Sequence, residues 1–254
     1  MVFYFTATGN SLYAAKQLEK APVSIAQAVH DLENVYEAEK IGIVCPVYGH
    51  EVPAPVREFL ERSVFKTPYF YMILTYGKRH GGAAELAEQM LTQIGIQPSY
   101  LNVLLMVDNF LPGFDMDKER MIDKKVDEHL KMILEDIESE KKFIVPVTNA
   151  DRADHQVYLT KIARELEQAY SNLYRITEKC IGCEICTKVC PKNCFTVNEQ
   201  KSTWHPEGCI TCMACIHACP MMAIQMNMPE PNPKARYRNE HISEIVEANN
   251  QVKK

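Results

Sequence analysis

Nine of the ten cysteines in this 254-residue chain lie between residues 180 and 219. They form the pattern C-x2-C-x2-C-x3-C-P, which begins at Cys180 and recurs at Cys209. Neither copy of the pattern contains enough apolar residues for a hydrophobic core of its own. We therefore expect the stability of this segment to depend on whatever its cysteines bind.

The rest of the sequence limits what the cysteines can bind. The chain begins MVFYF, without the basic segment and cleavage site of a signal peptide. We therefore expect a cytoplasmic protein, in which regularly spaced cysteines bind metal more often than they form disulfides. No apolar stretch approaches the ~18 residues that span a bilayer, which argues against membrane insertion. The net charge of −5 argues against nucleic acid as a partner, because binding to phosphate backbones depends on clustered Lys and Arg.

The cysteine spacing is that of the bacterial two-cluster ferredoxins. In that family three closely spaced cysteines bind one [4Fe–4S] cluster, and the cysteine before proline binds the other. The resemblance implies one cluster on Cys180, Cys183, Cys186 and Cys219, and a second on Cys190, Cys209, Cys212 and Cys215. Structural zinc is the alternative, but zinc sites usually pair cysteines as C-x2–4-C and take their other ligands from a distant segment. Because exposed clusters degrade in oxygen, an anaerobic source is expected.

Three nearby or similar residues have simpler interpretations. Cys194 corresponds to Ala223 in the repeat, so it is expected to be a small packing residue beside a cluster rather than a spare ligand. His217 lies between two cysteines of a complete ligand set, and a surface or packing role is expected for it. Cys45 ends an apolar run and is interpreted as a buried, inert thiol.

The first 150 residues alternate short apolar runs with amphipathic stretches, which predicts a parallel sheet covered by helices. An α/β fold with five strands in a doubly wound sheet, in the order 2-1-3-4-5, is expected. The predicted strands are residues 2–6, 23–28, 40–46, 69–75 and 101–107. The predicted helices are residues 11–20, 56–62, 84–94, 118–141 and 157–173.

The loop after the first predicted strand reads Thr6-Ala7-Thr8-Gly9-Asn10-Ser11. Its hydroxyls, and the backbone N–H groups at the start of a helix, could bind a phosphate. The loop lacks the Gly-Lys of a nucleoside-triphosphate site and the three glycines of a dinucleotide site. A helix cap formed by Thr8 or Asn10 is the alternative interpretation.

Two further loops are expected at the same edge of the sheet. Pro46-Val47-Tyr48-Gly49 follows the third predicted strand, and Thr75-Tyr76-Gly77 ends the fourth. In a sheet of this order, the loops after strands 1, 3 and 4 meet where the direction of strand addition reverses, and ligands bind there. Each loop places a tyrosine beside a glycine, which suits stacking on a flat ring, although tyrosines at strand ends are often plain packing residues.

With these loops, residues 1–150 resemble the flavodoxin family, whose phosphate loop reads Thr/Ser-x-Thr-Gly-Asn-Thr/Ser. The whole chain is similar to flavodoxin–ferredoxin fusion proteins. The resemblance implies FMN, with its phosphate at Thr6, Thr8, Gly9, Asn10 and Ser11. It also implies that the flavin ring lies against Pro46, Val47, Tyr48, Gly49, Thr75, Tyr76 and Gly77, with Asn109 as a further contact.

The expected organisation is an FMN-binding domain (1–150), a helical linker (151–174), a small α+β two-cluster ferredoxin domain (175–228) and a C-terminal tail (229–254). This organisation predicts electron transfer between FMN and two [4Fe–4S] clusters, with redox proteins as partners. A reductase of a small acceptor, with His50, His80, Arg79 and Lys78 as contacts, is the alternative. A third possibility is a first domain that has lost its flavin and serves only for docking.

Overall fold

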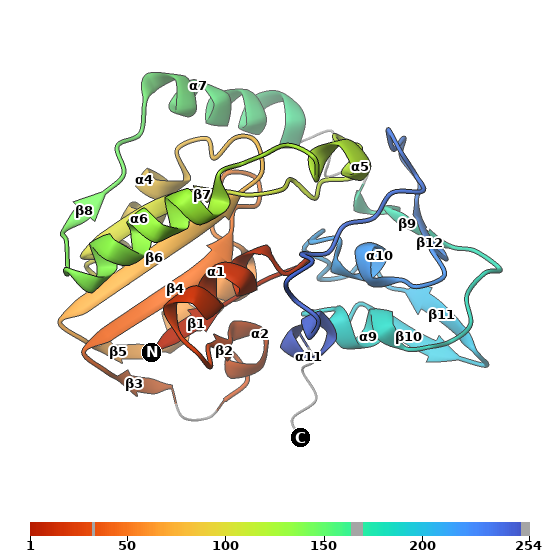
Figure 1. The fold of residues 1–254 in the computed structure, drawn as a ribbon. Coiled ribbons are helices and arrows are strands. Elements are labelled where there is room, and N and C mark those ends of the chain that lie inside the picture. Colours follow the sequence, from red (N-terminus) through yellow and green to blue (C-terminus); the bar gives the residue numbers. More distant parts are fainter. Residues whose placement is uncertain (32–33, 164–169, 250–254) are drawn as a thin grey trace.

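The computed structural model describes residues 1–31, 34–163 and 170–249 (Figure 1). Its first part contains a parallel sheet of six strands in the order β2-β1-β4-β6-β7-β8. The first five of these strands have the predicted order 2-1-3-4-5, and a sixth strand is added at the edge. The strands are β1 (Val2–Tyr4), β2 (Val23–Ser24), β4 (Lys40–Pro46), β6 (Tyr69–Tyr76), β7 (Tyr100–Leu105) and β8 (Phe143–Ile144).

The central strands are apolar on both sides because helices cover both faces of the sheet. β4 and β6 are paired in parallel along their whole shared length and are buried almost throughout. Leu12 of α1 and Leu130 of α6 pack on one face, whereas Phe59 of α3 and Leu91 of α4 pack on the other. These helices are α1 (Asn10–Leu18), α3 (Ala54–Arg62), α4 (Ala83–Gln93) and α6 (Val126–Glu138). Figure 1 shows α1 and α6 in front of the sheet and α4 behind it.

The predicted second strand at 23–28 is wrong over most of its length. Only Val23 and Ser24 pair with β1, and the chain then turns into the short helix α2 (Ile25–Ala28). Serine is a favourable residue at the start of a helix, and alanine and glutamine are good helix formers. The buried Ile25 and Ala28 thus pack against the sheet from a helical turn rather than from a strand.

The single helix predicted for 118–141 is also wrong. The structure has the short helix α5 (Met116–Glu119), a loop, and then α6. The Asp123 carboxylate accepts a hydrogen bond from the Lys125 amide, and Lys125 has a φ of 54°, which is not helical. The buried residues Leu130, Ile133 and Ile137 lie on one face of α6, whereas Met121, which falls within the predicted helix, is exposed.

The predicted helix 157–173 begins earlier than expected. Helix α7 (Asn149–Val157) starts at Thr148, which forms a reciprocal capping box with Asp151, and continues as a π-helical turn (Tyr158–Ile162). The part of this prediction at 164–169 lies outside the described residues. Two short strands that the sequence did not reveal, β3 (Val35–Glu37) and β5 (Val64–Lys66), form a separate parallel pair.

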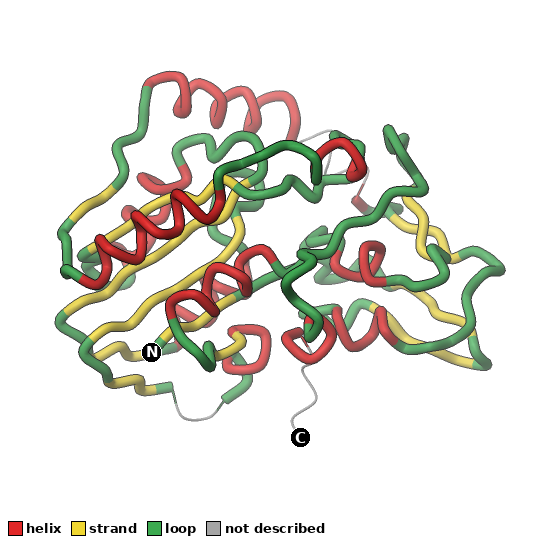
Figure 2. Tube along the Cα trace, viewed as in Figure 1, coloured by secondary structure: helices red, strands yellow, loops and turns green. Residues whose placement is uncertain are grey.

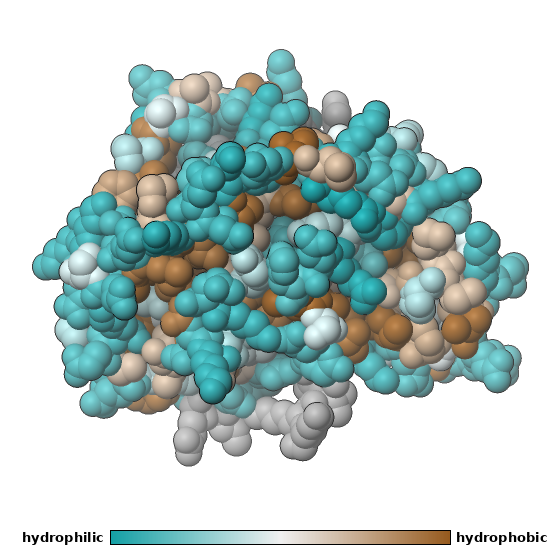
Figure 3. Space-filling model, in the orientation of Figure 1, coloured by the Kyte–Doolittle hydropathy of each residue, from teal (hydrophilic) through white to brown (hydrophobic). Residues whose placement is uncertain are grey.

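The second part of the chain is built from short elements joined by loops (Figure 2). β9 and β12 pair in antiparallel fashion, as do β10 and β11, and helices α9 and α10 contact each other. Figure 3 shows apolar side chains gathered over this part, at the right of the view. The elements are β9 (Tyr174–Ile176), α9 (Ile185–Val189), β10 (Phe195–Asn198), β11 (Lys201–Trp204), α10 (Ala214–Ala218) and β12 (Ile224–Met226).

The C-terminal tail returns to the first part of the chain. Figure 1 shows it passing from the second part towards α1 and ending in α11 (Ile245–Asn249). Ile242 and Ile245 are buried in the same apolar cluster as Leu12 of α1. Ile242 and Ile245 thus dock the tail on the first part of the chain. Within the described parts of the chain, no helix is long and apolar enough to cross a membrane.

Candidate functional site

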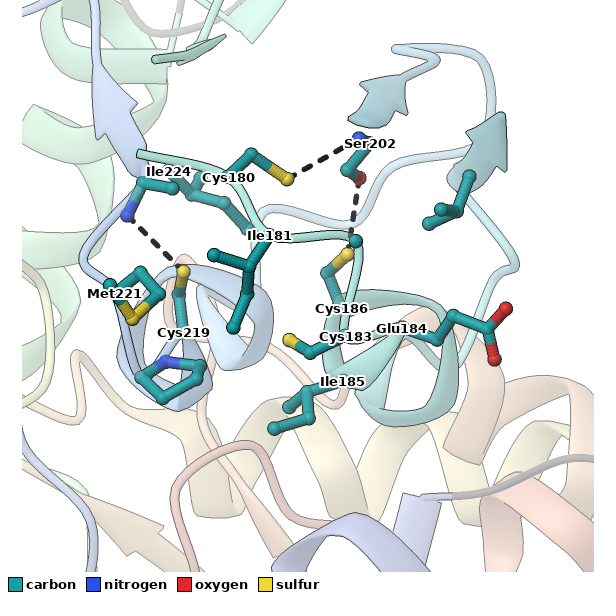
Figure 4. Close-up of a pocket in the computed structure, with 14 residues that line it drawn as sticks. Cys180, Ile181, Cys183, Glu184, Ile185, Cys186, Ser202, Cys219, Met221 and Ile224 are labelled. Atoms are coloured by element: carbon teal, nitrogen blue, oxygen red, sulfur yellow. Dashed lines mark hydrogen bonds between the residues drawn. The ribbon is translucent and has the colours of Figure 1, made fainter. Parts of the chain in front are cut away.

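A first cysteine cavity is lined by Cys180, Cys183, Cys186 and Cys219, the set that the sequence assigned to one cluster (Figure 4). Three of them come from the loop before α9 and its first turn, and Cys219 follows α10. The loop turns sharply at Gly182, which has a φ of 65°. A Cβ there would lie 2.6 Å from the Gln200 Cα, so glycine is required for this close approach.

A second cysteine cavity is lined by Cys190, Cys209, Cys212 and Cys215, the other predicted set. Cys194 also lines this cavity and is buried, as expected for a packing residue. The two repeats build matching contacts. The Cys194 amide donates to the Cys190 sulfur at 3.2 Å, and the Ala223 amide donates to the Cys219 sulfur at 3.2 Å.

The thiols of the second cysteine cavity lie where burial makes a negative charge unfavourable. Burial, followed by the neighbouring Cys190, raises the pKa of Cys212 to about 12, and burial also raises the pKa of Cys209 and Cys215. Four adjacent thiolates therefore need a positively charged partner to be stable in such a site. The iron ions of a [4Fe–4S] cluster supply that charge, and thiolate is a ligand that such clusters prefer. The residues of the second cavity thus fit the predicted group, and the first cavity contains the four matching cysteines.

A larger pocket, which we call the strand-end pocket, lies at the carboxyl ends of β1, β4, β6 and β7 and has a volume of about 450 Å³. This volume is within the range of sites for small molecules and cofactors. Of the predicted FMN contacts, all except Gly9 line it: Thr6, Thr8, Asn10, Ser11, Pro46, Val47, Tyr48, Gly49, Thr75, Tyr76, Gly77 and Asn109. The three predicted loops therefore do meet at one place.

The phosphate-type loop has the backbone shape that its sequence predicts. Gly9 has a φ of 101° and precedes the first residue of α1. Among the described residues no side chain caps this helix, which contradicts the interpretation of Thr8 or Asn10 as a helix cap. The Gly9 amide donates to Thr6 Oγ1 at 3.1 Å, and the Ser11 and Thr75 hydroxyls are 2.8 Å apart. The loop is thus held by its own hydroxyls and by the end of β6.

Several further pocket residues were missed by sequence reasoning. Tyr158 and Tyr170 reach it from the region predicted as a linker, and Asp108, Phe110 and Phe114 follow β7. Thr211, Cys212 and Met213 belong to the second cysteine run and also line it. No local signal marks these residues, because only the docking of the second part against the first brings them there. Cys212 is a lining residue of both the strand-end pocket and the second cysteine cavity.

The pocket wall combines a buried tyrosine hydroxyl with two closely packed glycines. The Tyr48 hydroxyl is buried and has no hydrogen-bond partner among the described residues. Burial, and then Cys212, raise the pKa of Tyr48 well above its ordinary value, so the hydroxyl keeps its proton and can donate. A Cβ at Gly49 would clash with the Tyr158 ring, and one at Gly77 would clash with the Asp108 carboxylate. Both glycines therefore allow a close approach that other residues would block.

A buried ion pair supports the Gly77 loop. Lys124 Nζ lies 3.2 Å from Glu119 Oε2, with the two side chains only 10% and 11% exposed. The same ammonium group donates to the Gly77 carbonyl at 3.2 Å. Burial raises the pKa of the neighbouring Asp108, although the Phe110 amide donates to it. The loop between α5 and α6 thus serves to bring Lys124 beneath Gly77.

We expect Glu119→Gln to lower the free energy of unfolding by about 3 kcal/mol, because it leaves the buried Lys124 ammonium without its counter-charge. Lys124→Met should cost a similar amount. In the double variant the loss should be clearly smaller than the sum of the two. Urea denaturation of the three variants checks this, and additive losses would contradict the pairing.

The histidines that the sequence singled out lie around one end of the pocket. His50 lines the pocket, and its ring lies 5.1 Å from that of Tyr158 and 5.6 Å from that of His155. Burial, and then His155, lower the pKa of His50. Lys78 and Arg79 also line the pocket, whereas His80 is turned to Asp151, 3.5 Å away.

His217 has a packing role rather than a surface one. It is 4% exposed, and burial lowers its pKa to about 4. Cys45 is fully buried beside the sheet core, where burial raises its pKa, as expected for an inert thiol.

One segment of the chain matches a known family model. Residues 172–220 match the family model described as the 4Fe-4S dicluster domain. The search of curated proteins gave no match. Among solved structures, the chain is similar to a "Putative flavoprotein from Bacteroides uniformis", at 18% sequence identity and a TM-score of 0.36. That similarity covers 47% of this chain and 94% of the other.

The dicluster match and the cysteine cavities agree about the second part, and two [4Fe–4S] clusters are implied by it. The first part has the strand order of the flavodoxin-like doubly wound folds, extended by one strand. The chain therefore has a flavodoxin–ferredoxin arrangement, in which a doubly wound α/β domain is followed by a 4Fe-4S dicluster domain at residues 172–220.

Proposed function

We propose that this protein transfers electrons between FMN in the strand-end pocket and two [4Fe–4S] clusters, and exchanges them with redox partner proteins. The observation that supports this most directly is the position of Cys212, which lines both the pocket and the second cysteine cavity. A ligand of one cluster would thus form part of the wall around the flavin. We still predict that the protein acts in the cytoplasm of an anaerobic organism.

In this proposal the phosphate of FMN is held by Thr6, Thr8, Gly9, Asn10 and Ser11. The ring would lie against Pro46–Gly49 and Thr75–Gly77, with Asn109 as a further contact. Bound FMN exchanges one or two electrons, whereas each cluster exchanges one, so the combination can split or join electron pairs. The protein's own residues would orient the ring, and Tyr48, Thr211 and Met213 line the pocket together with Cys212. The two cysteine sets of the cavities are the proposed cluster ligands.

Anaerobic purification followed by iron, sulfide and flavin analysis tests the cofactors. We expect one FMN and two [4Fe–4S] clusters per chain. Photoreduction of the flavin, followed by freeze-quench EPR, tests the transfer, and we expect a reduced-cluster signal to appear as the flavin absorbance recovers. Iron without flavin would support the docking-only alternative, and zinc in place of iron would overturn the cluster assignment.

A reductase of a small acceptor is the second candidate, because His50, Lys78 and Arg79 supply donors at one end of the pocket. Saturable turnover of an added acceptor that is lost in His50→Gln would favour it. His80→Gln is the matched control, since His80 is not among the lining residues. Equal turnover in the two variants would leave electron transfer as the function.

A further inference from the structure

His217 joins two segments that are far apart in the sequence. It lies on α10, midway between Cys215 of the second cysteine cavity and Cys219 of the first. Its Nε2 is 2.9 Å from the Asn109 carbonyl oxygen, and its Nδ1 is 3.0 Å from the Tyr237 amide. Asn109 follows β7, and Tyr237 belongs to the C-terminal tail.

The two contacts fix the state of the ring. The Tyr237 amide can only donate, so Nδ1 has no proton and accepts. The Asn109 carbonyl can only accept, so Nε2 has a proton and donates. His217 is therefore a neutral ring with one donor and one acceptor, and both are used by backbone groups that are buried or partly buried.

Both segments continue to the phosphate-type loop. The Asn109 side chain donates to Thr8 Oγ1 at 2.9 Å, and the Tyr237 hydroxyl donates to Asn10 Oδ1 at 2.6 Å. The backbone amide of Asn239 donates to the backbone carbonyl of Thr8 at 2.7 Å. Ile242 packs against Gly9, where an added Cβ would lie 3.2 Å from it.

These contacts close into a ring of hydrogen bonds. Asn10 Nδ2 donates to the Val107 carbonyl at 2.9 Å. Val107 lies two residues before Asn109 in the chain, so the ring is complete. The loop thus rests on the end of β7, on the tail and, through His217, on the helix that separates the two cysteine cavities. Of the members of this ring of hydrogen bonds, Thr8, Asn10, Val107 and Asn109 line the strand-end pocket.

We propose that His217 is a positioning residue that fixes the phosphate-type loop from the dicluster domain, so that affinity for FMN depends on α10 and on the tail. This inference rests on the proposed function for the presence of FMN in the pocket.

Four variants test the proposal by titrating FMN into flavin-depleted, cluster-loaded protein and following flavin fluorescence. His217→Ala loses both contacts and should weaken FMN binding about hundredfold. His217→Gln offers a donor for Asn109 and His217→Asn an acceptor for the Tyr237 amide, so each should recover about tenfold of that loss. Tyr237→Phe keeps the amide contact to His217, removes the hydroxyl contacts to Asn10 and Asn239, and should weaken binding about tenfold.

Two further measurements separate positioning from general damage. The ³¹P resonance of bound FMN should shift in His217→Ala and Tyr237→Phe, while iron content and cluster EPR signals stay as in the wild type. His205→Ala is the matched control, because His205 is in the same domain but is exposed and contacts Thr196. It should change neither the affinity nor the resonance.

Wild-type affinity for FMN in both His217→Ala and Tyr237→Phe would overturn the inference and leave the proposed function intact. If His217→Ala lost iron, the test of the inference would depend on Tyr237→Phe. Wild-type affinity for FMN in Tyr237→Phe would then overturn the inference. A wild-type protein that binds no FMN would instead refute the proposed function itself.

Discussion

Replacing Thr8 with glutamate is expected to weaken FMN binding about thousandfold while both clusters stay in place. Thr8 is buried in the phosphate-type loop and lines the strand-end pocket. A carboxylate there would lie within about 4 Å of the phosphate, and at the effective dielectric of a protein surface this repulsion is about 4 kcal/mol. That energy corresponds to about three powers of ten in the dissociation constant.

The loop is expected to tolerate this change, because backbone N–H groups at a helix start favour a carboxylate as they favour a phosphate. Fluorescence titration of FMN measures the affinity, and iron analysis measures the clusters. Thr8→Ser keeps the hydroxyl and should bind FMN nearly as well as the wild type. Loss of iron in parallel with flavin would contradict the assignment of Thr8 to the flavin alone.

Replacing Cys212 with alanine is expected to remove one cluster and to stop electron flow from the flavin. The variant leaves only three of the four proposed ligands, Cys190, Cys209 and Cys215, whereas a closed [4Fe–4S] site needs four. Iron and sulfide should fall by about half. The remaining cluster should still be reduced by dithionite but no longer by the photoreduced flavin.

Cys194→Ala is the matched control for this result, because Cys194 lines the same cavity without belonging to the proposed ligand set. It should keep the wild-type iron content. Cys190→Ala should behave as Cys212→Ala does, although Cys190 belongs to the first repeat in the sequence. Loss of the other cluster in Cys190→Ala would show that the fourth cysteines are not exchanged between the repeats.

The sequence predicted the parts of this protein that depend on local patterns. Buried strands such as β4 and β6 are continuous apolar runs, and their order places the loops at Thr8, Tyr48 and Tyr76 together. Cysteine spacing predicted which thiols share each cavity. In each case residues close in sequence, or a general rule of sheet topology, determine the arrangement.

The features that the sequence did not predict depend on contacts between distant segments. The helix predicted for residues 118–141 is interrupted near Lys124, whose ammonium group pairs with Glu119 and donates to the Gly77 carbonyl. The sequence of this segment does not indicate the interruption. Strand β8 has only two residues, too few for a pattern. Tyr158, Tyr170 and Cys212 reach the strand-end pocket only because the second part of the chain docks against the first.

The exchange of cysteines between the repeats has a consequence for how the protein is made. Cys219 completes the cavity that begins at Cys180, and Cys215 completes the one that includes Cys190. Neither set of four is present until the ribosome has synthesised the chain almost to residue 220. Inorganic sulfide and iron can therefore be inserted only late in translation or after it, when the doubly wound domain has already left the exit tunnel.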